Sequence, residues 1–280
     1  MRMKLIYRYL RRKLGKLIRN DDVATDRGFF NYVYTKRRDL DEARPDLKVV
    51  AIGSSLSDYG FHSAGWSESF NLGLTSSDLS VEFELYQKIL RDAPNLKVVL
   101  LYSGVFMPGF NLACSSERNR LVLYKHFFGI DYNPVNRIQQ NAERRILRKI
   151  NKFAFESKNS DRGYIYEKPH YPGFDVSARA KTHLRENQRE PDQMDYFRKL
   201  KSLVESDGRV LYLVIPPVRS DYREVLKDLW YGDLFENFKS IMPSDRVLDF
   251  YKHKGFTDRD FGDCDHMNSL GAEKLTGMIR

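Results

Sequence analysis

Two short stretches at opposite ends of the chain carry residue types that can perform nucleophilic chemistry. Ser55 follows the apolar run 49–52 and Gly53, a pattern that predicts a buried strand ending in a tight turn. The second stretch holds Asp263 and His266 just before a predicted C-terminal helix. A serine hydroxyl becomes a good nucleophile when an imidazole takes its proton and a carboxylate holds that imidazole in one tautomer. Because an apolar strand ending in Gly-Ser-Ser is usually only a strand and a turn, the second stretch is what makes the first informative.

The elements that must position these residues alternate along the chain. Apolar runs predict five strands and amphipathic spacing predicts helices, with strands near 49–52, 67–73, 97–102, 210–215 and 246–250 and helices near 78–91, 191–206, 221–240 and from 268 onward. Strands separated by helices predict a parallel, doubly wound sheet in a three-layer α/β domain. Open sheets of this kind bind ligands beyond the carboxyl ends of their strands, where Ser55 is expected.

Between about 105 and 190 this regular pattern weakens, which predicts an inserted subdomain that is mostly helical or irregular. Its one clear helix is expected near 134–155, with Arg144, Arg145 and Arg148 on the side opposite its apolar residues. Two interpretations stay open for these arginines. They form either a solvated helix face or a basic wall that binds an anionic substrate.

Composition limits the classes of protein. A chain of 280 residues with 41% hydrophobic and 13% aromatic residues can bury a sizeable core. Its two cysteines, Cys114 and Cys264, are far apart in sequence and give neither a disulfide framework nor a Cys-x-x-Cys metal motif. We therefore expect reduced thiols, a cytosolic setting and no metal site. No bound cofactor is expected either.

The net charge of +9 is concentrated at the N-terminus. Residues 1–20 hold eight basic residues and no acid, while the remaining 39 basic residues face 38 acidic ones. Ile6, Leu10, Leu14 and Leu17 recur there at helical spacing, which predicts a basic amphipathic helix. Charges interrupt the apolar runs too early for a signal peptide or a membrane span. The arm either lies on an anionic membrane surface or docks on a protein. No nucleic-acid-binding motif accompanies it, so no nucleic-acid partner is expected.

The order of these blocks resembles the SGNH (GDSL-like) hydrolase superfamily: Gly53-x-Ser55 after the first strand, Asn71-Leu72-Gly73 after the second, and Asp-x-Asp-His-x-Asn-x-x-Gly-Ala over 263–272. The last two forms look most like the branch associated with bacterial surface-polysaccharide biosynthesis and O-acetylation. The resemblance implies a flavodoxin-like fold over 47–280, with the insertion inside it. Residues 1–46 would then be the basic amphipathic arm and a polar linker.

The resemblance also implies roles for single residues. Ser55 would be the nucleophile, His266 the general base and Asp263 the residue that orients His266; Asp265 is the less favoured alternative for that last role. The backbone N–H groups of Ser55 and Gly73 would donate to the tetrahedral oxyanion. The third donor of the family is an asparagine after the third strand, where this chain has Tyr102-Ser103-Gly104-Val105. Ser103 is the expected replacement, and Asn111 is a weaker candidate.

These residues predict acyl transfer through an acyl-Ser55 intermediate. We expect an O-acetyltransferase that uses acetyl-CoA to modify a bacterial surface polysaccharide, such as capsule or lipopolysaccharide, or its precursor. The alternatives are an esterase acting on the same glycans and a non-catalytic component of a membrane-associated glycan assembly complex. The arm suggests a cytoplasmic protein held peripherally on the inner face of the membrane, with Arg144, Arg145 and Arg148 as candidate substrate contacts.

Overall fold

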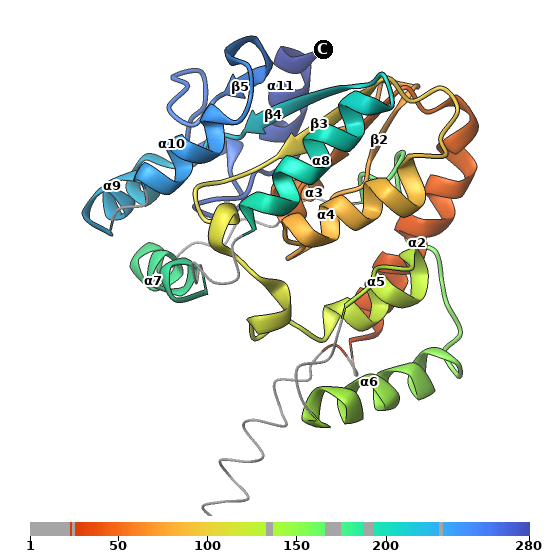
Figure 1. Ribbon diagram of the computed structural model, residues 1–280. Helices are drawn as coiled ribbons and strands as arrows, with labels where there is room; N and C mark the ends of the chain where they lie inside the picture. Colours follow the sequence, from red (N-terminus) through yellow and green to blue (C-terminus); the bar gives the residue numbers. More distant parts are fainter. Residues whose placement is uncertain (1–22, 24–25, 133–136, 166–174, 187–192, 230–231) are drawn as a thin grey trace, which may run out of the picture.

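The computed structural model describes residues 23, 26–132, 137–165, 175–186, 193–229 and 232–280 (Figure 1). The predicted arm over residues 1–20 lies outside these ranges, so its conformation stays a prediction. Within the described residues the chain is an α/β protein built on one five-stranded sheet.

All five strands run parallel, in the order β2-β1-β3-β4-β5. They are β1 (Val49–Ile52), β2 (Ser69–Asn71), β3 (Val98–Tyr102), β4 (Val210–Ile215) and β5 (Val247–Asp249). Each lies within one of the predicted strand ranges. The central strands read as nearly continuous apolar runs because helices bury both of their faces.

Successive side chains of a strand point to opposite faces, and each face has its own layer of helices. Val50 and Ile52 of β1 pack with apolar residues of α2 (Arg27–Ala43), α4 (Leu79–Leu85) and α8 (Met194–Ser206). Val49 and Ala51 point the other way and pack with residues of α3 (Ser54–Gly60) and α11 (Ser269–Ile279). The predicted parallel sheet between two helical layers is therefore present.

The linker prediction for residues 21–46 is wrong over most of its length, because α2 occupies Arg27–Ala43. Asp26 caps this helix by accepting a hydrogen bond from the Phe29 N–H at 2.9 Å. The sequence of α2 looks polar although the helix packs on the core. One reason is Lys36, which is fully buried and lies 2.8 Å from the carboxylate of Asp58. A buried ion pair gives a core-facing helix a polar sequence.

The insertion also contains more helix than predicted. It holds α5 (Arg120–Phe128), α6 (Arg137–Ile150) and α7 (Val176–Glu186). Buried residues of α5 and α6 belong to the same apolar cluster as the sheet. In Figure 1, α6 lies on the far side of α5 from the strands. The range 221–240, predicted as one helix, holds α9 (Ser220–Leu229) and α10 (Gly232–Ser240), with residues 230–231 between them outside the described ranges.

Candidate active site

The turn between β1 and α3 presents Ser55. Gly53 has a φ of 120°, and a β-carbon there would lie 2.0 Å from the backbone oxygen of Tyr102, so only glycine fits. Ser54 follows with a φ of 61°, an unusual value for a residue with a side chain. Ser55 then lies in the first turn of α3, with its side chain in a cavity. Its N–H has no preceding helical carbonyl to bond.

His266 and Asp263 lie on the loop before α11, next to Ser55 in space. The Ser55 Oγ is 2.8 Å from His266 Nε2, and His266 Nδ1 is 2.9 Å from the nearer oxygen of Asp263. The Asp263 carboxylate also accepts the backbone N–H of His266 at 2.8 Å, which fixes its orientation. An ionised carboxylate only accepts hydrogen bonds, so Nδ1 carries the proton and Nε2 accepts from the Ser55 hydroxyl. The structure thus brings together the three residues that the sequence analysis selected.

Asp265 has a different partner. Its two carboxylate oxygens accept hydrogen bonds from the Arg179 guanidinium at 3.1 and 3.0 Å, and it lies 3.8 Å from His266 Nδ1. Burial would raise the pKa of Asp265, but the facing His266 and Arg179 outweigh burial and lower it. Asp263 is therefore the carboxylate in hydrogen-bonding position to orient His266, and Asp265 anchors Arg179.

A cavity of about 250 Å³ opens over the Ser55 hydroxyl. Its lining combines hydroxyl groups, aromatic rings and charged side chains of both signs: Ser54, Ser55, Tyr59, Thr75, Ser76, Phe106, Phe110, Glu117, Arg120, Arg179, Thr182, His183, Glu186 and His266. Helix α7 supplies four of these residues and packs on α9 and Cys264 through Ala180. Sequence reasoning missed this contribution of the insertion, because no local pattern in α7 marks it as part of a site.

The charges in this cavity are paired. The Arg120 guanidinium lies 2.6 Å from Glu117, and Ser76 Oγ bonds to both of them. Arg179 is paired with Asp265 as described above. His183 stays neutral, because burial lowers its pKa to about 4, and its Nδ1 is hydrogen-bonded to the hydroxyl of Tyr222. The cavity therefore offers many hydrogen-bonding groups with little net charge.

The structure does not support the oxyanion role that the sequence analysis predicted for the Gly73 N–H. Its N–H already donates to the side-chain oxygen of Asn71 at 2.9 Å, and Gly73 does not line the cavity. Ser76, three residues later, does line it and has a φ of 66°. The Ser76 N–H bonds no acceptor within the described residues. The N–H of Ser76 is thus better placed than that of Gly73 to act together with the Ser55 N–H as an oxyanion donor.

The two residues predicted as the third oxyanion donor also do not line the cavity. Ser103 is fully buried at the end of β3, where its hydroxyl makes only a long contact of 3.4 Å to the Gly104 oxygen. Asn111 precedes a short 3₁₀ turn. Neither residue lines the cavity over Ser55, so neither prediction gains support.

Glu82 of α4 connects the two turns that carry these backbone donors. One of its oxygens accepts the Ser54 N–H at 3.1 Å and the hydroxyl of Ser77, the neighbours of Ser55 and Ser76. Glu82 is fully buried, and burial raises its pKa from 4.5 to about 8. The sequence analysis did not single out Glu82, which lies within the helix predicted over 78–91. Only the fold shows that its carboxyl group is hydrogen-bonded to both turns.

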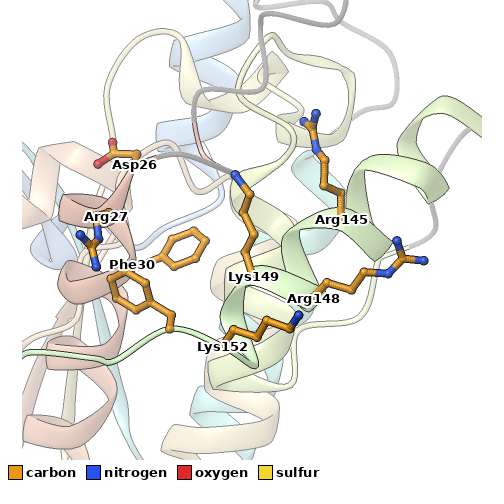
Figure 2. Close-up of a pocket in the computed structure, with 8 residues that line it drawn as sticks. Asp26, Arg27, Phe30, Arg145, Arg148, Lys149 and Lys152 are labelled. Carbon is orange, nitrogen blue, oxygen red and sulfur yellow. The ribbon is translucent and has the colours of Figure 1, made fainter.

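The three predicted substrate arginines do not reach the Ser55 cavity. Arg145 and Arg148 of α6 line a second pocket, formed with the start of α2 (Figure 2). Arg144 is exposed on the same helix and lines neither pocket. The prediction that these arginines form a basic wall beside the serine therefore gains no support.

The loop before α11 could suggest a metal site, since side-chain atoms of Asp263, Cys264 and Asp265 lie within 4.8 Å of one another. Both carboxylates already have partners, His266 and Arg179 respectively. Cys264 is fully buried, and burial raises the pKa of its thiol, which disfavours the thiolate that binds metals. The donor set therefore fits the orientation of His266 better than it fits a cation.

No protein-family model matches this chain, and no curated protein is significantly similar to it. Among the described residues, no helix combines the length and the apolar character needed to cross a bilayer.

Proposed function

We propose that the protein is an SGNH-type serine acyltransferase that transfers an acetyl group from acetyl-CoA to a hydroxyl of a bacterial surface polysaccharide or its precursor. One observation carries the proposal: the Ser55 hydroxyl is 2.8 Å from His266 Nε2, and Asp263 holds the opposite ring nitrogen at 2.9 Å. A buried serine, histidine and aspartate in this order form the hydrogen-bonded chain that activates a serine nucleophile.

The chemistry has two balanced steps. Ser55 Oγ attacks the thioester carbonyl while His266 Nε2 takes the hydroxyl proton; the tetrahedral intermediate expels the CoA sulfur, which leaves as the thiol with that proton. A sugar hydroxyl then attacks the acetyl-Ser55 carbonyl and gives its proton to His266. Collapse of this second intermediate breaks the bond to Ser55 Oγ, which recovers the proton. The N–H groups of Ser55 and Ser76 would stabilise the oxyanion in both steps.

The lining of the cavity supports a sugar acceptor. Hydroxyl groups of Thr75, Ser76 and Thr182 lie beside paired charged side chains, a combination that can donate to and accept from several sugar hydroxyls. Phe106 and Phe110 offer apolar surface to the C–H face of a sugar ring. Because the charges are paired, this cavity suits a neutral sugar better than a polyanion. The acetyl-CoA donor points to a cytoplasmic protein at the inner face of the membrane.

The test is CoA release from acetyl-CoA by the full chain, with and without a panel of capsular and lipopolysaccharide glycans. Ser55→Ala and His266→Ala should abolish glycan-dependent release. Ser57→Ala is the matched control, because its buried hydroxyl lies two residues away and has no hydrogen-bond partner in the described part of the chain. Full transfer by Ser55→Ala would refute the mechanism.

Two other outcomes would change the assignment. Hydrolysis of acetylated glycans by the wild type but not by Ser55→Ala, without CoA release, would identify an esterase. If a fluorophosphonate probe also failed to label Ser55 and a glycosyltransferase co-purified with the protein, the non-catalytic alternative would replace the proposal.

A further inference from the structure

A second pocket lies between the start of α2 and α6, with a cavity volume of about 520 Å³ (Figure 2). Its lining consists of Asp26, Arg27, Phe30, Arg145, Arg148, Lys149, Lys152 and Phe153. None of these residues lines the cavity over Ser55. We call it the basic pocket; it has no role in the chemistry proposed above.

The rim of the basic pocket is strongly cationic. Its lining contains five lysine or arginine residues and a single acidic residue, Asp26. This carboxylate is already used as the N-cap of α2, where it accepts the Phe29 N–H at 2.9 Å. Arg148, Lys149 and Lys152 are exposed to solvent. With five basic residues against one acidic residue, the lining carries a net positive charge, which favours an anion.

The floor of the basic pocket is apolar and rigid. Phe30 is only 3% exposed and packs edge-on against Phe153, with ring centroids 5.1 Å apart. The Arg27 guanidinium lies 5.4 Å from the Phe153 ring centroid, so that cation and ring hold each other in place. Figure 2 shows Arg27 and Phe30 on α2 across the pocket from Lys149. An apolar floor below a cationic rim suits a ligand that is both anionic and apolar.

The neighbouring sequence identifies the occupant. Residues 1–20 carry eight basic residues and no acid, with apolar residues at helical spacing, and are joined to Asp26 through residues 21–25, which include Asp21 and Asp22. Like charges disfavour this arm as the partner of the cationic rim. An anionic bilayer attracts the arm and the rim alike, and each presents apolar groups beside its cations.

We propose that the basic pocket binds the headgroups of anionic phospholipids and is part of the face that docks on an anionic bilayer. The inference does not depend on the chemistry at Ser55. It extends the predicted membrane contact from the arm to the folded domain, because α2 and α6 supply cations that the arm does not contain.

The experiment is co-sedimentation of the full chain with vesicles of phosphatidylglycerol and phosphatidylcholine in equal parts, compared with phosphatidylcholine alone. The test variant is Arg148→Gln/Lys152→Gln. The control is Arg198→Gln/Lys199→Gln on α8, which removes the same charge from a surface away from the basic pocket. Each basic residue at an anionic surface is worth roughly a fivefold factor in binding, so the test variant should bind about 25-fold more weakly. Thermal unfolding of each variant reports its folding.

The outcomes decide the proposal. Binding that requires phosphatidylglycerol, weakens at high salt and falls in the test variant but not in the control supports it. Equal binding of the two variants would assign any membrane contact to the arm alone and overturn it. Failure to bind the anionic vesicles, or equal binding to phosphatidylcholine alone, would also overturn it. Calorimetry with inorganic phosphate and diphosphate covers the remaining source of phosphate: stoichiometric binding without vesicle binding would make this a site for a soluble anion.

Discussion

Replacing Glu82 with glutamine should remove a loss of stability that the wild-type protein shows as the pH rises toward 8. The buried carboxyl group keeps its proton in the folded protein until the pH reaches about 8, whereas its ordinary pKa is 4.5. Between these values the folded state binds one more proton than the unfolded state, so the free energy of unfolding falls as the pH rises. The stabilising proton is fully present below pH 4.5 and is lost through the folded pKa.

The magnitude follows from the shift. A displacement from 4.5 to about 8 corresponds to about 5 kcal/mol over the whole window, at 1.36 kcal/mol per pH unit. In the lower part of this pH range His183 offsets the effect of Glu82, because burial lowers the pKa of His183 to about 4. His183 therefore makes stability rise with pH up to its ordinary pKa of 6.5. Above pH 6.5 His183 no longer raises the stability, so the effect of Glu82 is seen alone. The free energy of unfolding should then fall by about 2 kcal/mol between pH 6.5 and 8.

Glutamine keeps the oxygen that accepts the Ser54 N–H and cannot ionise. Its amide nitrogen takes the place of Glu82 Oε2, which has no hydrogen-bond partner in the described part of the chain. An unsatisfied buried donor costs about 1–3 kcal/mol at every pH. The variant should therefore be less stable than the wild type at low pH. Because the wild type alone loses about 5 kcal/mol over the window, the two stability curves should cross, and the variant should be the more stable protein near pH 8.

Urea unfolding of both proteins across this pH range measures the difference directly. Asp78, whose pKa burial also raises, is present in both proteins, so its contribution largely cancels. Glu273→Gln on α11 is the matched control, because Glu273 is exposed, and its curve should run parallel to that of the wild type. A parallel curve for Glu82→Gln would refute the assignment of the proton to Glu82.

Three further changes test the site and the core. Asp263→Asn should keep the fold but hold His266 in the wrong tautomer, slowing fluorophosphonate labelling of the serine by roughly 10³- to 10⁴-fold; an unchanged rate would remove Asp263 from the mechanism. Gly53→Ala forces a β-carbon against the backbone of β3 and should cost about 3 kcal/mol in urea unfolding, whereas a change within error would mean that the turn can relax. Lys36→Met leaves Asp58 buried without its cation and should cost about 3–5 kcal/mol, partly recovered by adding Asp58→Asn; no recovery would show that the loss is not electrostatic.

Much of the fold was predictable because it depends on local pattern. The runs at 49–52 and 210–215 are short, apolar and bounded by turn residues, and both are strands. Asp263 and His266 are close in sequence, so one loop is enough to bring them into contact. The position of Ser55 at the end of β1 follows from the strand and the glycine after it. The sequence by itself thus determined the sheet and the three residues of the candidate triad.

Only the tertiary structure decided which groups surround the serine. The Gly73 N–H is bonded to Asn71, whereas Ser76 lines the cavity and its N–H has no acceptor among the described residues; neither fact can be read from the sequence. Helix α7 reaches the cavity by packing on α9, a contact between distant parts of the chain. Long-range packing decides whether a backbone donor is already bonded and which pocket the basic residues of a helix line. Neither residue type nor periodicity encodes that packing.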